Sequence, residues 1–185
     1  DFQKKLSELK FLDPACGSGN FLTETYISLR RLENEAINLL NQGQILLGST
    51  NPIKVSIGQF YGIEINDFAV TVAKTALWIA ESQMMKETEE VVHMSLDFLP
   101  LKSYANIIEG NALRVDWESV VPKHELNYIM GNPPFVGYSL QSKEQKEDIL
   151  SIYIDEKGKL YKTAGKIDYV AGWYFKAAQM IRSTN

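Results

Sequence analysis

The sequence has few of the residues that several functional classes require. Its 185 residues include a single cysteine, Cys16, and only two histidines, His93 and His124. One cysteine cannot form an internal disulfide bond, and neither histidine has a carboxylate or thiol at ligand spacing. We therefore expect a reducing, intracellular setting and no metal site. No apolar run approaches the roughly 20 residues of a membrane span, and no cleavable signal pattern stands at the start, so no membrane partner is expected.

An excess of positive charge is also missing. Lysine and arginine number 19 against 23 aspartates and glutamates, which gives a formal net charge of -4. A domain that tracks phosphates usually has a basic face, so this balance gives no indication of nucleic-acid binding. One local exception is a stretch without acids that holds Lys157, Lys159, Lys162 and Lys166. It predicts either a solvated loop or a contact with DNA phosphate.

The pattern of apolar residues indicates an α/β domain. With 45% hydrophobic residues, the chain can bury the core of one globular unit. Buried strands are predicted at 10–12, 59–65, 106–108 and 126–130, and helices at 21–43, 67–85, 142–152 and from 168 onward. Helices that separate strands favour a doubly wound, mostly parallel sheet with helices on both faces.

The number of strands and the early first motif suggest part of a larger protein. Four predicted strands are fewer than the about six or seven of a complete doubly wound domain. The first strong motif is reached by residue 12. We therefore expect a domain that is truncated at both ends.

Each predicted strand ends in a polar or glycine-containing turn. The first turn, Asp13-Pro-Ala-Cys-Gly-Ser-Gly-Asn20, contains Gly17 and Gly19, which let the backbone approach a ligand at a helix N-terminus. A dinucleotide loop is disfavoured, because Leu22 replaces the third glycine and the next strand-end acid, Glu64, lies 45 residues beyond Gly19. An acid before the glycines suits a ligand that carries an ammonium or sulfonium group. A purely structural turn is the alternative.

Two further strand ends offer groups that fit a nucleoside. Glu64 follows a buried strand, where a carboxylate can accept two hydrogen bonds from a ribose diol, although a lone glutamate there can also be merely solvated. Asn111 ends the third strand, and its amide can offer an acceptor to an exocyclic amine and a donor to a ring nitrogen. Since the carboxyl ends of parallel strands share one edge of a sheet, these side chains are expected to meet there.

The fourth turn, Asn132-Pro133-Pro134-Phe135, is the most informative. Two prolines fix backbone angles and remove amide donors, so the Asn132 side-chain oxygen and the Pro133 carbonyl remain as rigid acceptors beside an aromatic ring. This arrangement suits a planar amine, whose delocalised lone pair becomes nucleophilic when two acceptors draw its hydrogens out of plane. A proline-rich structural turn is the alternative.

Together these motifs closely resemble those of S-adenosylmethionine-dependent DNA adenine-N6 methyltransferases. The resemblance is carried by Asp13-Pro-Ala-Cys-Gly-Ser-Gly-Asn-Phe-Leu22, Tyr61-Gly-Ile-Glu-Ile-Asn66, Gly110-Asn-Ala-Leu113 and Gly131-Asn-Pro-Pro-Phe135. It is strongest to the methyltransferase segments of restriction-modification proteins. It implies a Rossmann-like class I methyltransferase fold in a prokaryotic, cytoplasmic protein, with S-adenosylmethionine as cofactor.

The resemblance also implies a role for each motif. Residues 1–113 would form the cofactor-binding half, and residues 114–185 would carry the catalytic turn and the loop and helices after it. The implied catalytic residues are Asn132, Pro133, Pro134 and Phe135. The implied cofactor-binding residues are Asp13, Ala15, Cys16, Gly17, Gly19, Asn20, Phe21, Glu64, Ile65, Asn111 and Ala112. Asn111 departs from the family pattern, since many relatives have Asp there.

The implied reaction moves a methyl group to the N6 amine of an adenine rotated out of DNA. DNA would be bound mainly by regions outside this chain, which also explains the acidic balance. Two alternatives stay open: transfer to another planar nitrogen, such as cytosine N4 or a protein glutamine amide, or a cofactor-binding module that is inactive on its own.

Overall fold

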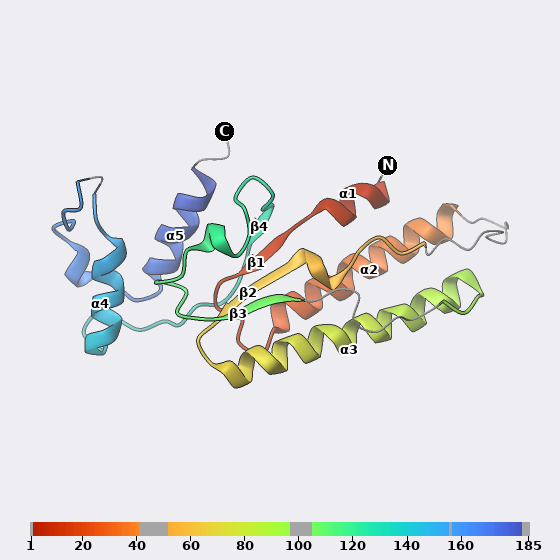
Figure 1. Ribbon diagram of the computed structural model, residues 1–185, viewed down its shortest axis with the longest axis horizontal. Coiled ribbons are helices and arrows are strands. Elements are labelled where there is room, and N and C mark those ends of the chain that lie inside the picture. The colour runs from red at the N-terminus through yellow and green to blue at the C-terminus, as the bar shows by residue number, and fades with distance from the viewer. Residues whose placement is uncertain (1, 41–51, 97–104, 156, 183–185) are drawn as a thin grey trace.

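A four-stranded parallel sheet forms the centre of the protein (Figure 1). The computed structural model describes residues 2–40, 52–96, 105–155 and 157–182. The strands are β1 (Phe11–Asp13), β2 (Phe60–Glu64), β3 (Asn106–Glu109) and β4 (Tyr128–Ile129), in the order β3-β2-β1-β4. All of the pairings are parallel, so the predicted α/β class and parallel sheet are confirmed.

Helices lie on both faces of this sheet, as predicted. The described helices are α1 (Phe2–Glu8), α2 (Asn20–Leu40), α3 (Asp67–Val92), α4 (Lys143–Ile152) and α5 (Ala171–Ile181). In Figure 1, α2 and α3 run side by side along the sheet, while α4 and α5 lie together at the other end of the view. None of the helices in these described ranges is long and apolar enough to cross a membrane.

Two buried clusters hold the layers together. Neighbouring residues of a strand point to opposite faces, so Phe11 enters the cluster under α2 and α3, whereas Leu12 enters the cluster under α5. The first cluster includes ring contacts of Phe11 with Phe60 and Tyr128, each with centroids 5.1 Å apart. The second cluster contains Trp117 and Trp173. Both faces of the central strand β1 are therefore buried against neighbouring side chains, whereas β3 and β4 at the edges are partly exposed.

The observed elements differ from the predicted ones mainly at their ends. Helix α1 was not predicted, and α3 continues seven residues past its predicted end at 85, to Val92. The apolar stripe ends there, but buried Thr88 continues the contact with α2 by donating a hydrogen bond to Asn34 at 2.7 Å. The end of α2, predicted near residue 43, lies outside the described residues.

The later elements are shorter than predicted. β4 spans two residues instead of five, because Asn127 is used in a turn in which its side chain accepts a hydrogen bond from the Lys10 amide at 2.8 Å. Helix α5 begins at Ala171 and not at 168, since Asp168 accepts a hydrogen bond from the Tyr138 amide at 2.9 Å. Both differences come from contacts between segments distant in the sequence.

The strand order determines where a ligand can enter. β1 pairs with β2 on one side and with β4 on the other, so the chain reverses its direction of travel across the sheet at β1. In open parallel sheets, ligands bind outside the carboxyl ends of the strands at such a reversal. The turns after β1 and β4 are therefore neighbours at the edge where the sequence predicts a site.

Candidate cofactor and amine site

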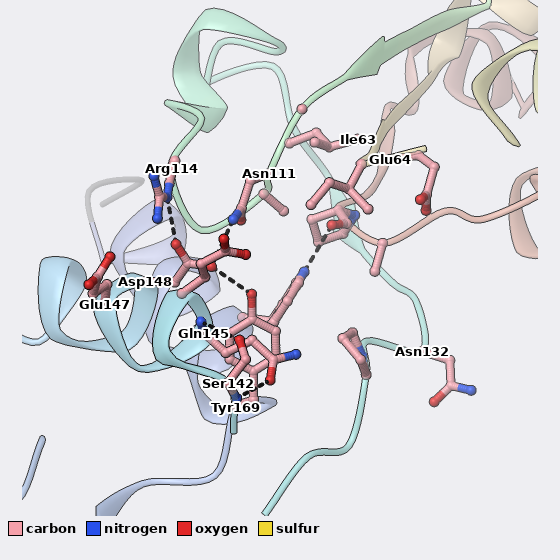
Figure 2. Close-up of a pocket in the computed structure, with 18 residues that line it drawn as sticks. Ile63, Glu64, Asn111, Arg114, Asn132, Ser142, Gln145, Glu147, Asp148 and Tyr169 are labelled. Atoms are coloured by element: carbon pink, nitrogen blue, oxygen red, sulfur yellow. Dashed lines mark hydrogen bonds and ion pairs between the residues drawn. The ribbon is translucent and has the colours of Figure 1, made fainter. Parts of the chain in front are cut away.

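A cavity of about 880 Å³ opens at the carboxyl ends of the strands (Figure 2). The turns after all four strands contribute to its wall, and α4 and α5 close its other side. Seven of the predicted site residues line it: Ala15, Glu64, Ile65, Asn111, Ala112, Asn132 and Pro134. The other eight do not: Asp13, Cys16, Gly17, Gly19, Asn20, Phe21, Pro133 and Phe135.

The first turn is fastened to the end of β2. The Cys16 amide donates to the Ile63 carbonyl at 3.2 Å, and the Gly17 amide donates to the Glu64 carboxylate at 2.9 Å. Gly17 has a φ of +53°, and a Cβ there would meet nothing within 4 Å. Gly19 has a φ of +82°, and its Cβ would lie 2.9 Å from that of Ala73. Gly17 thus leaves open space, whereas Gly19 permits close packing on α3.

Cys16 belongs to the packed part of this turn. Its side chain is buried, and burial raises the pKa of the thiol to about 12. The negative charges of Asp13 and Glu64 act in the same direction. A thiol that stays protonated at neutral pH is a poor nucleophile. The Cys16 side chain therefore fills space beside Gly62 and is not suited to act as a nucleophile.

Asp13 joins the first turn to the fourth. Its side chain is 1% exposed, and one carboxylate oxygen accepts a hydrogen bond from the Ala15 amide at 3.0 Å. The other oxygen, Oδ2, has no hydrogen-bond partner among the described residues. Burial raises the pKa of Asp13 to about 6, and the charge of Glu64 adds to this increase. The carboxylate lies against Gly131, whose φ of +148° and lack of a side chain make room for it.

Glu64 projects from the end of β2 with both oxygens in use. Oε1 accepts a hydrogen bond from the Asn66 amide at 3.0 Å, and Oε2 accepts the one from Gly17. Each carboxylate oxygen can accept more than one hydrogen bond, so both retain capacity for a ligand. Ile65, the next residue, is 67% exposed and adds apolar surface to the cavity wall.

Asn111 is held by a residue that the sequence did not identify. Its amide nitrogen donates to Asp148 of α4 at 2.8 Å, and its oxygen accepts from the Leu113 amide at 2.9 Å. Asp148 is 3% exposed and also accepts from Arg114 at 2.5 Å and from the Tyr169 hydroxyl at 2.8 Å. Figure 2 shows this cluster at the end of the cavity away from Asn132.

The fourth turn contributes its polar groups without such support. Asn132 is exposed, and no hydrogen bond of its side chain is described within residues 105–155. Asn132 and Pro134 line the main cavity, whereas Pro133 and Asp13 line a smaller neighbouring one of about 200 Å³. Phe135 is 74% exposed, so its ring is free to contact a large planar group.

The wall of the cavity contains no metal centre in the described part of the chain. Within residues 2–40, 52–96, 105–155 and 157–182, no group of three or more histidine, cysteine or acidic side chains could hold a metal ion. The groups gathered around the strand ends are instead hydrogen-bond acceptors, the buried carboxylates of Asp13 and Asp148, and exposed apolar surface. Such groups can bind a nucleoside and a neighbouring planar amine.

The fold and these turns define a Rossmann-like α/β domain with its ligand site at the strand ends. The chain belongs to the family described as the DNA-methyltransferase domain of MmeI, which matches residues 1–185. The resemblance inferred from the four motifs is thereby confirmed at the level of a methyltransferase segment of a restriction-modification enzyme.

Individual relatives agree with this assignment. DNA methyltransferase A of Bacillus subtilis is 45% identical over 185 residues, which cover 98% of this chain and 20% of that protein. The adenine-specific methyltransferase PglX of Streptomyces coelicolor is 33% identical over 75 residues, or 40% of this chain and 6% of that protein. The solved structure of the Type IIL restriction-modification enzyme MmeI in complex with DNA superimposes with a TM-score of 0.90 at 42% identity, covering 98% of this chain and 24% of MmeI.

Proposed function

We propose that this domain binds S-adenosylmethionine in the strand-end cavity and directs its methyl group to the N6 amine of an adenine rotated out of DNA. The observation that carries the proposal is the shared edge of the sheet: Glu64, Asn111 and Asn132 all line one cavity. The chain spans about a quarter or less of the relatives it matches, so the activity of the whole protein is part of the proposal.

The described residues fit this cofactor. The cavity of about 880 Å³ is large enough for a nucleoside with an amino-acid tail. Glu64 would accept hydrogen bonds from the ribose hydroxyls, and Asn111 would meet the adenine edge beside Ile65. The unpartnered, buried oxygen of Asp13, which lines the smaller cavity beside the main one, would face the positive charge at the methionine end. When bound, S-adenosylmethionine supplies a methyl group activated by its sulfonium.

The fourth turn would prepare the target amine. The Asn132 side-chain oxygen and the Pro133 carbonyl would accept its two hydrogens, which localises the nitrogen lone pair for in-line attack. The exposed ring of Phe135 would stack on the base after it leaves the duplex. The Asn132 amide is not a base, so the proton would pass to solvent. Catalysis would then rest on position and electrostatics.

The comparisons favour DNA adenine over the other planar nitrogens. The relatives are described as DNA methyltransferases, one as adenine-specific, and MmeI was solved with DNA. The lysines at 157, 159, 162 and 166 are exposed and would add phosphate contacts. Most of the DNA-binding surface would come from regions outside this chain. The bacterial relatives favour a prokaryotic cytoplasm, where DNA and this cofactor are both present.

The direct test is a product assay. The intact protein, including the regions outside this chain, is incubated with DNA and with S-adenosylmethionine that carries a labelled methyl group. The DNA is then digested, and its nucleosides are identified by mass. The proposal predicts label in N6-methyl-2′-deoxyadenosine. Label in N4-methyl-2′-deoxycytidine or in protein glutamine would identify one of the other planar nitrogens. Cofactor binding without any transfer would instead indicate a binding module.

A further inference from the structure

The orientation of the Asn111 amide is fixed from both ends. An asparagine amide can present either its oxygen or its nitrogen to a ligand, and only its hydrogen-bond partners decide which. Here the Leu113 amide can only donate, and it bonds to the Asn111 oxygen at 2.9 Å. The Asp148 carboxylate, next to Arg114, can only accept, and it bonds to the Asn111 nitrogen at 2.8 Å. A flipped amide would break both bonds.

This orientation leaves Asn111 as an acceptor toward the cavity. The carbonyl oxygen has a second lone pair beyond the one used by Leu113. One of the two N–H groups of the nitrogen bonds to Asp148, at the cavity wall formed by α4. A ligand group that donates a hydrogen bond is therefore favoured at this point, and a group that only accepts is opposed by the Asn111 oxygen.

Asp148 itself is held firmly enough to determine the orientation of the Asn111 amide. Its side chain is 3% exposed, and three donors converge on it: Asn111 and Arg114 from the loop after β3, and the Tyr169 hydroxyl. Figure 2 shows these bonds as dashed lines around the carboxylate. Rotation of the Asn111 amide would take one hydrogen bond away from the buried Asp148 carboxylate, which is costly.

We propose that Asp148 is a positioning residue for cofactor selectivity: it makes Asn111 present its oxygen to the 6-amino group of the cofactor's adenine and so excludes a 6-oxo purine. The proposal rests on the proposed cofactor site, in which Asn111 meets the adenine edge. It adds a residue of α4, 37 positions beyond Asn111 in the chain, to the determinants of that site.

The test compares two ligands by calorimetry on the full chain. S-adenosylhomocysteine carries the 6-amino group, and S-inosylhomocysteine carries a 6-oxo group in its place. The wild type should bind S-adenosylhomocysteine about 100-fold more tightly, because the 6-oxo group of S-inosylhomocysteine and the Asn111 oxygen are both acceptors. In the Asp148→Asn variant, residue 148 can donate as well as accept, so only the Leu113 amide still selects the orientation of the Asn111 amide. The preference should then fall by about tenfold.

A residue swap separates positioning from simple damage. In the double variant Asn111→Asp with Asp148→Asn, residue 111 is an obligate acceptor and the bond between the two side chains is restored. We expect this variant to regain at least about 30-fold preference for the 6-amino ligand, whereas Asn111→Asp alone places two carboxylates together and weakens binding of both ligands. The control is Glu118→Gln, which weakens the surface ion pair with Lys123 and touches neither Asn111 nor Asp148, so the preference should stay.

The outcomes separate this inference from the function on which it rests. A folded wild type that binds neither ligand would overturn the cofactor site and the inference together. Binding of S-adenosylhomocysteine with an unchanged preference in Asp148→Asn would overturn the inference alone. A folded swap variant without restored preference would also overturn it, and this result does not depend on whether Asp148→Asn folds by itself.

Discussion

The two ends of the cavity are built in different ways. At the nucleoside end, Glu64 and Asn111 are each held by two hydrogen bonds from the protein itself. At the amine end, Asn132 and Phe135 are exposed, and the rigidity of the turn comes from Pro133 and Pro134. One end is thus preorganised by internal contacts, and the other has exposed acceptors that, in the proposed function, would bind the target base.

This difference predicts which property each end controls. A change at the nucleoside end should weaken ligand binding before it affects chemistry, because the protein's own bonds shape that site. A change at the amine end should reduce the rate with little effect on binding of the cofactor, because those groups would act only when the base is in place. The following variants test this division in order of decreasing effect.

The largest effect is expected for Asn132→Ala. Removal of one of two acceptors should lower methyl transfer to DNA by about 1000-fold in the intact protein, since the amine lone pair is no longer localised. Affinity for S-adenosylhomocysteine should stay within about twofold, because the Asn132 side chain supports no bond at the nucleoside end. The measurement is labelled-methyl transfer with calorimetry of the same sample. Wild-type turnover in this variant would remove the proposed role.

The next largest effect is expected for Glu64→Ala. Loss of the carboxylate removes its ribose contacts and its bond to the Gly17 amide, so affinity for S-adenosylhomocysteine should fall by about 10- to 100-fold. Calorimetry checks this, and Glu118→Ala is a suitable control, since Glu118 pairs with Lys123 at the surface. If Glu64→Ala retained full affinity, the ribose assignment would be wrong.

A smaller effect is expected from pH. The buried Asp13 has its pKa raised to about 6, so it is protonated below that pH and ionised above it. Only the ionised form attracts the positive charge at the methionine end of the ligand. Affinity for S-adenosylhomocysteine should therefore rise by about tenfold from pH 5 to pH 7.5, as the carboxylate loses its proton.

Two observations check the assignment of this pH effect to Asp13. The ligand-free fold should lose stability as pH rises from about 4 to about 6, because burial favours the protonated carboxyl that the native state retains and the unfolded chain has released. The Asp13→Asn variant should show neither dependence in calorimetry or denaturant unfolding. A slope of the same size in that variant would assign the titration to another group.

The smallest effect is expected at Cys16. Burial raises the pKa of its thiol to about 12, so the folded protein should react very slowly with iodoacetamide at pH 8. The urea-unfolded chain, in which the thiol is exposed, is the matched control and should be alkylated readily. Rapid alkylation of the folded protein would show that the first turn is looser than the bonds from Ile63 and Glu64 imply.

The same division explains how much could be predicted from the sequence. The four turns could be predicted because glycine, proline and polar residues directly after an apolar strand are a local sign of a turn. The predicted parallel sheet, which brings Glu64, Asn111 and Asn132 to one cavity, is confirmed. Asp148 was not found, because one acid among several in a polar helix gives no local sign of burial. Its importance comes from contacts with Asn111, Arg114 and Tyr169 that only the folded chain provides.

The predicted ends of helices and strands were wrong for a related reason. The predicted end of α3 followed the apolar stripe, but polar Thr88 continues the buried face through bonds to Asn34 and Arg30. The roles of all the predicted site residues remain predictions, and two of these residues, Asp13 and Pro133, line the smaller cavity beside the main one. Patterns of apolar residues therefore located the layers, whereas buried polar contacts determined the details of the site.

The central claim is that the strand-end cavity holds the cofactor with its nucleoside at Glu64 and Asn111. The most direct measurement is a crystal structure of the full chain with S-adenosylhomocysteine bound. The account predicts ribose hydroxyls on the Glu64 carboxylate, the adenine amine on the Asn111 oxygen, and the amino-acid tail near Asp13 and Gly17. Ligand bound elsewhere, or an adenine that does not approach Asn111, would contradict it.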